Sequence, residues 1–250
     1  RGVFTGLAVI TVFASICLWV FLPENKRTDE KLPSLKLQLK EMGEVFRSRI
    51  FWDIAPLAAI SQGANMAING LWMKPWLRDV AGLNSDNAAQ LLFVMTLAFI
   101  GGFLTLGIIA ERLSQLFDIR PISISVWGMT LFLFIQGTMI FGGFGSPLIL
   151  VLLLGFFGTA SVLVYAGYAQ IFPKYLSGRV STILNLLVFI CAFILQWGVG
   201  VIIEIWPATE TGYAPESYQA ALGVLFLLQA AGLIWYFLSL KFSRKQGVLI

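Results

Sequence analysis

The chain has 250 residues, of which 58% are apolar and only 12% are charged, whereas an ordinary soluble domain has roughly 25% charged residues. So little charge cannot cover a surface in water, which excludes a soluble globular protein. The formal net charge is +4 and the sequence contains no histidine. Because the basic residues are scattered, we expect no nucleic-acid partner, and because the commonest metal ligand is missing, we expect no metal or other cofactor.

Long apolar segments dominate the sequence. A helix that crosses the hydrocarbon core needs about 20 mostly apolar residues, whereas strands of a membrane barrel are about 10 residues long and alternate in polarity. The sequence therefore predicts an all-α integral membrane protein with seven transmembrane helices. The segments of sufficient length are residues 2–22, 54–77, 88–110, 122–141, 148–172, 180–206 and 218–240.

Turn residues separate these segments. Pro23 ends the first, the glycine-rich run 142–147 forms a tight turn between the fourth and fifth, Pro173 ends the fifth, and Pro207 follows the sixth. Proline and glycine are the residues that most often end helices and form turns. Each predicted segment is therefore a separate helix.

The longest connection, residues 23–50, is polar and charged. Leu35, Leu39, Met42 and Phe46 nevertheless recur at helical spacing with charged residues between them. This pattern predicts an amphipathic helix that lies on the membrane surface. The alternation of leucines over residues 35–39 also fits a short strand, and a plain linker between two bundles remains an alternative.

Basic residues are distributed unequally between the two sides of the predicted bundle. One side receives only Arg1, Lys74 and Arg78. The other receives Lys26, Arg27, Lys31, Lys36, Lys40, Arg47, Arg49, Arg112, Arg120, Lys174, Arg179, Lys241, Arg244 and Lys245. Because cytoplasmic loops carry the excess of lysine and arginine, we expect the linker and the C-terminus in the cytoplasm.

Four short segments resemble a known family. The run 107–112, Gly-Ile-Ile-Ala-Glu-Arg, resembles the first half of the signature loop of the major facilitator superfamily, Gly-x-x-Ala-Asp/Glu-Arg. Ser114, Gln115 and Leu116 stand where the family has Gly-Arg-Arg/Lys. The pair Pro23-Glu24 is similar to the end of the family's sixth helix. Residues 172–179 are similar to its loop between helices ten and eleven, and residues 69–79 to bacterial permeases of the superfamily.

The resemblance implies a domain organisation and a function. Residues 1–22 would be the last helix of a missing N-terminal half, 23–50 a cytoplasmic linker, 51–240 a six-helix bundle of two inverted three-helix repeats, and 241–250 a basic cytoplasmic tail. It further implies secondary active transport of a small solute by alternating access, in the bacterial inner membrane, with the lipid bilayer and the N-terminal half as partners.

A polar stripe runs along the second predicted span. Ser61, Gln62, Asn65 and Asn69 share one helix face because every third or fourth residue does so. Amides are costly to bury without hydrogen bonds, so the stripe faces other helices or a wet cavity. The resemblance implies that this helix, the family's seventh, lines the solute cavity. The alternative is hydrogen bonding between helices.

The fifth span offers Tyr165 and Tyr168, three residues apart. The resemblance makes this the family's tenth helix, which also lines the cavity, so both tyrosines are candidate solute-binding residues. An aromatic packing pair is the alternative. Gln136 and Gln196 are single amides in their spans, and we expect them to bond neighbouring helices.

Few charges lie at the level of the membrane. Gly107, Glu111 and Arg112 are candidate gating residues, because a carboxylate at a helix end can hold a contact that opening must break. Asp53 lies near the start of the second span, where a carboxylate complements the helix N-terminus.

Two other functional classes need different residues or share these features. An intramembrane enzyme needs a nucleophile with a base or a metal cluster, and the spans contain no histidine and no grouped carboxylates, so we expect no enzymatic activity. A non-transporting scaffold or sensor has the same sequence features and stays open. For a transporter, amides, hydroxyls and aromatic rings without a membrane charge suit a neutral polar or amphipathic solute.

Overall fold

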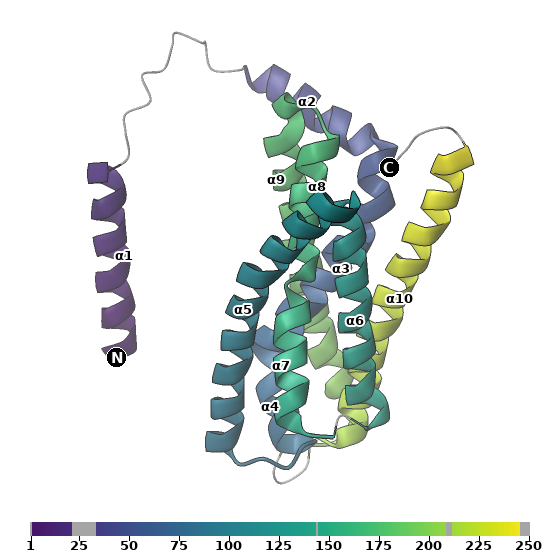
Figure 1. Ribbon diagram of the computed structural model, residues 1–250. Coiled ribbons are helices and arrows are strands. Elements are labelled where there is room, and N and C mark those ends of the chain that lie inside the picture. Colours follow the sequence, from purple (N-terminus) through teal and green to yellow (C-terminus); the bar gives the residue numbers. More distant parts are fainter. Residues whose placement is uncertain (1, 22–33, 144, 209–211, 246–250) are drawn as a thin grey trace. The chain divides into compact units, whose positions relative to one another are not determined.

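The computed structural model describes residues 2–21, 34–143, 145–208 and 212–245 (Figure 1). The chain divides into two compact units, residues 1–38 and residues 39–250. Within the described residues every regular element is a helix, which confirms the all-α class. The leucine-rich residues 35–39 lie in a helix, so the alternative of a short strand is wrong there. The predicted helix end at Pro23-Glu24 lies outside the described residues.

The helices follow one another closely along the chain. In the first unit α1 covers Gly2–Phe21, and α2, Leu35–Arg47, begins there and continues into the second. The others are α3 (Arg49–Ala67), the π-helical turn η1 (Ile68–Trp72), α4 (Met73–Asp79), α5 (Ser85–Phe117), α6 (Pro121–Phe141), α7 (Pro147–Gly158), the 3₁₀ turn η2 (Ala160–Val162), α8 (Leu163–Ile171), α9 (Lys174–Ile203) and α10 (Pro215–Lys245).

Six helical segments in the described part of the chain are long and apolar enough to cross a membrane. They are Phe4–Phe21, Ser85–Phe117, Pro121–Phe141, Pro147–Ile171, Lys174–Ile203 and Pro215–Phe242. The predicted span 54–77 is helical from end to end as α3, η1 and α4, but its polar stripe makes it less apolar and it is not one of the six. Its crossing of the membrane stays a prediction.

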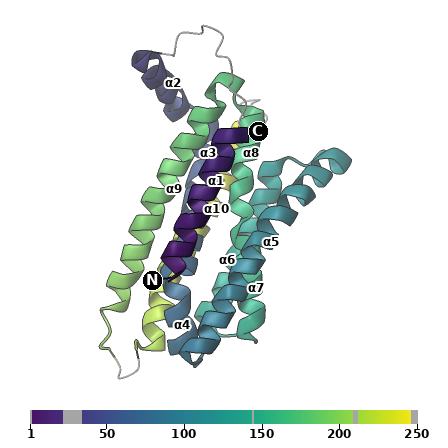
Figure 2. The same cartoon turned by 90° about the vertical axis from the view of Figure 1, so that its left-hand side faces the viewer.

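The second unit is built from two triplets of helices. The first triplet is α3–α4, α5 and α6, and the second is α7–α8, α9 and α10. The largest contacts join α3 to α9 and α5 to α7, and α6 packs against α10; Figures 1 and 2 show these neighbours side by side. If each helix is exchanged with its counterpart in the other triplet, the α3–α9 contact becomes the α5–α7 contact, and the α6–α10 contact is unchanged. Two equivalent three-helix repeats would have this property.

Glycines allow α5 and α7 to approach closely. A Cβ atom at Gly102 would lie 2.5 Å from the carbonyl oxygen of Phe156, and one at Gly155 would lie 2.5 Å from that of Met95. Any larger residue would separate the helices, so the two glycines fix this interface.

Two apolar clusters form the core. One contains Trp76 and Tyr218 and lies toward α4; the other contains Val45, Phe51 and Tyr168 and lies toward α2. We call the corresponding ends of the bundle the α4 end and the α2 end; they lie at the bottom and the top of Figure 1.

Several helix boundaries differ from those predicted. The third span, predicted to end at residue 110, continues through the whole signature-like run, because α5 extends to Phe117 and ends where Asp118 adopts φ 54°. Gly178 and Arg179 likewise lie inside α9, which begins directly after Pro173. The fifth span is not one continuous helix, since η2 interrupts it. The turn at residues 142–147 is confirmed: Gly142, Gly143 and Gly145 all have positive φ angles.

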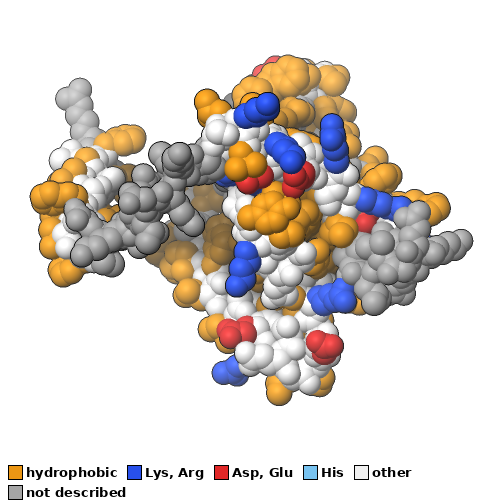
Figure 3. Space-filling model, turned by 90° about the horizontal axis from the view of Figure 1, so that it is seen from above, with side chains coloured by type: hydrophobic (Ala, Val, Ile, Leu, Met, Phe, Trp, Pro, Cys, Tyr) orange, Lys and Arg blue, Asp and Glu red, His pale blue; other side chains and the backbone are white. Residues whose placement is uncertain are grey.

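Basic residues collect at the α2 end. Figure 3 looks onto this end and shows lysine and arginine side chains over much of it. The helix termini that meet there contribute Lys40, Arg47, Arg49, Arg112, Arg120, Lys174, Arg179 and Lys241. Lys74 and Arg78 lie on α4, at the opposite end. Arg1, Lys26, Arg27 and Lys31 lie outside the described residues.

Candidate functional site

The two asparagines of the polar stripe bond to each other. The Nδ2 atom of Asn69 donates to Oδ1 of Asn65 across 2.5 Å. Asn65 is buried and occupies space that Gly158 of α7 leaves open, because a Cβ atom at Gly158 would overlap the Asn65 amide. The stripe therefore faces the other triplet, where α3 and α7, the first helices of the two triplets, meet.

Several buried polar atoms without a hydrogen-bond partner lie on α3, η1 and η2. Within the described residues they include Oε1 of Gln62, Oδ1 of Asn69 and Oγ of Ser161. Ser61 is also buried. α3 contacts η2, so these atoms come from adjoining segments. An unsatisfied buried group costs about 1–3 kcal/mol, and we therefore expect water, a solute or another part of the protein to supply the missing partners.

A cavity lies beside the stripe, between η1 and α5. Its volume is about 190 Å³ and it is lined by Asn69, Leu92, Met95, Thr96 and Phe99. The Thr96 hydroxyl donates to the carbonyl of Leu92 at 2.9 Å. The lining thus presents the Asn69 amide next to aliphatic, thioether and aromatic groups.

The π turn gives a physical reason for the cavity's position. In η1 the N–H of Met73 bonds the carbonyl of Ile68, five residues earlier, so the helix is locally wider than an α-helix. Such turns occur frequently at functional sites. The second triplet carries a matching irregularity, η2, in its own first helix. No residue pattern predicts η1: Asn69 and Gly70 are poor helix formers, but they do not specify a π turn.

The two tyrosines of α8 point to different helices. Tyr168 is fully buried and its hydroxyl donates to the carbonyl of Phe51 on α3 at 2.6 Å. The Tyr165 hydroxyl donates to Oδ1 of Asn185 on α9 at 3.2 Å. They do not present their hydroxyls together, because the Tyr168 hydroxyl bonds α3 and the Tyr165 hydroxyl bonds α9. The Tyr168 hydroxyl is used in a hydrogen bond between helices, whereas Tyr165 stays partly accessible. Its partner Asn185 was not among the residues predicted for the site.

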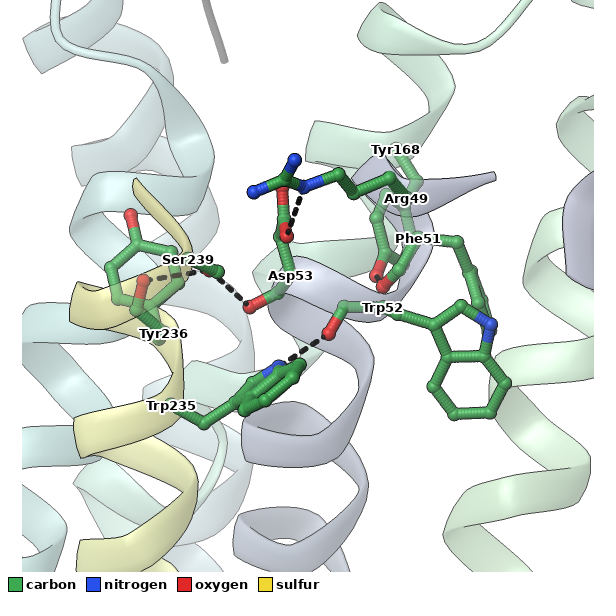
Figure 4. Close-up of polar contacts among 8 residues, drawn as sticks. All are labelled: Arg49, Phe51, Trp52, Asp53, Tyr168, Trp235, Tyr236 and Ser239. Atoms are coloured by element: carbon green, nitrogen blue, oxygen red, sulfur yellow. Dashed lines mark hydrogen bonds and ion pairs between the residues drawn. The ribbon is translucent and has the colours of Figure 1, made fainter. Parts of the chain in front are cut away.

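Tyr168 belongs to a joint at the α2 end of α3, shown in Figure 4. Three consecutive carbonyls of α3 accept side-chain hydrogen bonds: that of Phe51 from Tyr168, that of Trp52 from the indole N–H of Trp235 at 2.8 Å, and that of Asp53 from Ser239 at 3.5 Å. Tyr168 comes from α8 and the other two donors from α10.

Pro56 explains why the carbonyl of Trp52 needs an outside donor. In an α-helix this carbonyl would accept from the N–H of residue 56, but proline has none. The Trp235 indole replaces the lost bond. We refer to the Phe51, Trp52 and Asp53 carbonyls with their three side-chain donors as the carbonyl joint.

The role predicted for Asp53 needs correction. α3 begins at Arg49, so Asp53 lies beyond its first turn and does not cap it. Its buried carboxylate lies 3.9 Å from Nε of Arg49, one turn earlier. The helix begins five residues before the predicted start of the span, because Arg49 and Asp53 interrupt the apolar run that defines the span but do not interrupt the helix.

The candidate gating residues lie in the last turns of α5, at the α2 end. Glu111 and Arg112 are exposed, and Oε1 of Glu111 accepts a bond from Gln115 at 3.3 Å. Space is open where a Cβ atom would extend from Gly107. Neither charged residue forms an ion pair within the described residues. A polar cavity of about 430 Å³ lies nearby, lined by Ser114, Asp118, Arg120, Gln170 and Ile171.

At the α4 end, Asp79 ties α4 to the start of α10. Its Oδ2 atom accepts from the backbone N–H of Tyr213 at 3.1 Å and from the Tyr218 hydroxyl at 2.6 Å. Gly212 packs directly against the carboxylate. We call this arrangement the Asp79 knot. No sequence pattern pointed to it, because its members are more than 130 residues apart.

The single amides act between helices, as predicted. Nε2 of Gln136 donates to the carbonyl of Leu222, and Gln229 donates to Oε1 of Gln136. Nε2 of Gln196 donates to the carbonyl of Met66. In the described part of the chain no group of three metal-ligating side chains comes together.

The comparison with known proteins agrees with the helical architecture. A sequence model of the Major Facilitator Superfamily matches residues 1–194, from α1 into α9. A search of curated proteins finds no match to the chain. The matched region covers more than half of the chain and includes both irregular helices and the signature-like run. The chain therefore belongs to the Major Facilitator Superfamily, a family of membrane proteins that transport solutes.

Proposed function

We propose that the chain forms the C-terminal half of a permease that carries out secondary active transport of a small uncharged solute by alternating access. The observation that carries this proposal is the Asn69 amide, whose Oδ1 atom has no partner among the described residues and which lines the cavity beside α5. A buried oxygen without a hydrogen-bond partner is suited to a ligand that supplies a hydrogen-bond donor.

The lining of the cavity favours one class of solute. Leu92, Met95 and Phe99 present apolar and aromatic surface, and Asn69 supplies an amide. No charged side chain lines this cavity, so an ion would lose its hydration without compensation. A neutral amphipathic solute with a hydrogen-bond donor fits these groups.

The irregular helices support a transport cycle. Binding sites of secondary transporters are commonly built where spanning helices are interrupted. Here α3–α4 and α7–α8 are both interrupted and meet at Asn65 and Gly158. We assign Ser61, Gln62, Asn65, Asn69 and Tyr165 to the solute wall, and we leave Tyr168 to the carbonyl joint.

The proposed topology places the α2 end in the cytoplasm and the α4 end outside, in a bacterial inner membrane. The collection of basic residues at the α2 end supports it. In this arrangement α1 is the last helix of the N-terminal half. Glu111 and Arg112 then lie at the cytoplasmic exit of α5, where we propose that they form a gate contact with the N-terminal half.

The proposal is tested on the full-length protein in proteoliposomes. Uncharged amphipathic solutes are screened by thermal stabilisation and then by counterflow of the labelled solute. Replacing Asn65 or Asn69 with leucine should weaken binding by about 0.5–1.5 kcal/mol per lost hydrogen bond. Asn87→Leu, an exposed amide at the start of α5, is the matched control and should bind normally.

The outcomes separate transport from a sensor or scaffold role. A solute that binds but shows no counterflow would favour the sensor. Normal binding by Asn69→Leu would remove the cavity from the solute site. Glu111→Gln should leave affinity intact and change the transport rate, because a gate contact differs between the two states; unchanged kinetics would exclude the gate.

A further inference from the structure

Helix α2 is attached to the bundle through its acidic residues. Nε of Arg179 on α9 lies 2.9 Å from Oε2 of Glu41, whose side chain is only 13% exposed. The Tyr175 hydroxyl donates to Oε2 of Glu44 at 3.3 Å. Both carboxylates of α2 are therefore turned toward the first turns of α9.

Apolar contacts also attach the side of α2 that faces the bundle. Val45 is completely buried in the cluster at the α2 end, and Met42 packs against that cluster. The indole N–H of Trp52 donates to the carbonyl of Phe46 at 2.8 Å, which closes the turn between α2 and α3. The position of α2 on the bundle is thus fixed by packing as well as by charge.

The remaining side of α2 combines bases with large apolar residues. Leu39 is 68% exposed and Phe46 is 41% exposed. Lys40 and Arg47 are exposed and form no ion pair within the described residues. We call these four residues the outer face of α2. Because Glu41 and Glu44 point to α9, this face carries positive charge alone.

We infer that the outer face of α2 binds the anionic lipid headgroups of the leaflet at the α2 end. A face with bases beside leucine and phenylalanine matches a charged interface above hydrocarbon: the apolar side chains enter the acyl region and the bases remain among the headgroups. A single residue, Ser48, separates α2 from α3, so α2 is held at the level where the bundle leaves the membrane. The inference does not depend on the identity of the solute.

Gly43 offers a position for a probe on the exposed side. Nothing lies within 4 Å of a Cβ atom built there, so Gly43→Cys is tolerated sterically. The full-length protein carrying this cysteine, in a background without other cysteines, is labelled with a small fluorophore and placed in phosphatidylcholine vesicles. Nitroxide-labelled phosphatidylglycerol or nitroxide-labelled phosphatidylcholine is then added at equal mole fractions, and quenching is measured.

We expect preferential quenching by phosphatidylglycerol, with an apparent association about fivefold stronger for each basic side chain that contributes fully. The preference should fall when salt is raised from 50 to 500 mM, because screening shortens the range of the attraction. Replacing both Lys40 and Arg47 with glutamine should bring the two lipids close to equal quenching. Lys174→Gln removes an exposed base at the same end but on α9, and should preserve the preference.

Three results would overturn the inference. Equal quenching by both lipids in the unmutated protein would show that the face does not select anionic headgroups. Absence of quenching by either lipid would show that protein, such as the N-terminal half, covers it. An equal loss of preference in Lys174→Gln would assign the effect to the general charge of this end.

Discussion

The helical run from Arg49 to Asp79 is satisfied at both ends and unsatisfied in its middle. At the α2 end, the carbonyl joint receives donors from α8 and α10. At the α4 end, the Asp79 knot receives two donors from the start of α10 and the residues before it. Between them, Gln62 and Asn69 keep buried oxygen atoms without partners in the described residues.

Polar groups in this helical run therefore have two roles: those at the ends bond neighbouring helices, and those in the middle can bond a ligand. The paired ends fix α3 and α4 to their neighbours and contribute to stability. The buried oxygen atoms of Gln62 and Asn69 in the middle add nothing to stability and are available to a ligand. Substitutions at the ends should therefore change the free energy of unfolding, whereas those in the middle should change solute binding.

The largest effect is expected at the Asp79 knot. Tyr218→Phe removes a hydrogen bond to a carboxylate, and such bonds contribute about 1.5–3 kcal/mol. The free energy of unfolding, measured by denaturation in mixed micelles, should fall by that amount. Tyr213→Phe is the matched control, because Tyr213 bonds Asp79 through its backbone N–H. Equal losses in the two variants would show that the Asp79 bond is not the cause.

The carbonyl joint should show the next largest effect. Trp235→Phe leaves the carbonyl of Trp52 without a donor, since Pro56 has no N–H, and should cost about 1–2 kcal/mol. Pro56→Ala restores a helical N–H at the missing position, so the double variant Pro56→Ala/Trp235→Phe should recover most of the loss. Additive losses in the double-mutant cycle would contradict this account of the joint.

In the middle of the run, stability and binding should separate. Asn69→Leu removes one unsatisfied buried oxygen and leaves another, Oδ1 of Asn65, without its donor. Because these two changes offset each other, the free energy of unfolding should stay within about 0.5 kcal/mol. Gln136→Leu is the comparison, because Gln136 both donates and accepts between α6 and α10. It should lower stability by about 1–3 kcal/mol. A loss of that size for Asn69→Leu would place it with the paired ends.

Sequence patterns predicted the helices well because apolar length is a local property. The spans, the glycine turn and the interhelical amides at Gln136 and Gln196 follow from residue type and position. The polar stripe was also visible, since Asn65 and Asn69 share a face by spacing alone. Its unpaired oxygen atoms were not, because pairing depends on which helix faces each amide.

The features that sequence missed are contacts between distant segments. The Asp79 knot joins residues more than 130 positions apart, and the Tyr168 hydroxyl is taken by Phe51, 117 residues away. The π turn η1 was missed because Asn69 and Gly70 lower helix propensity without specifying a π turn. The third span was predicted to end at residue 110 because the charged Glu111 and Arg112 follow, whereas the helix continues until Asp118 takes a left-handed conformation.

The smallest effect is expected where α2 joins the paired end of the run. The Glu41–Arg179 pair is partly exposed, with 13% and 30% of the two side chains accessible, so its coupling should be about 0.2–1 kcal/mol. Glu41→Gln, Arg179→Gln and the double variant form the cycle, with unfolding free energy as the measurement. Because Val45 remains buried in each variant, α2 should stay helical and attached. A coupling near zero would leave apolar packing as the main attachment of α2, whereas a coupling well above 1 kcal/mol would show that the ion pair holds α2 as firmly as the carbonyl joint holds α3.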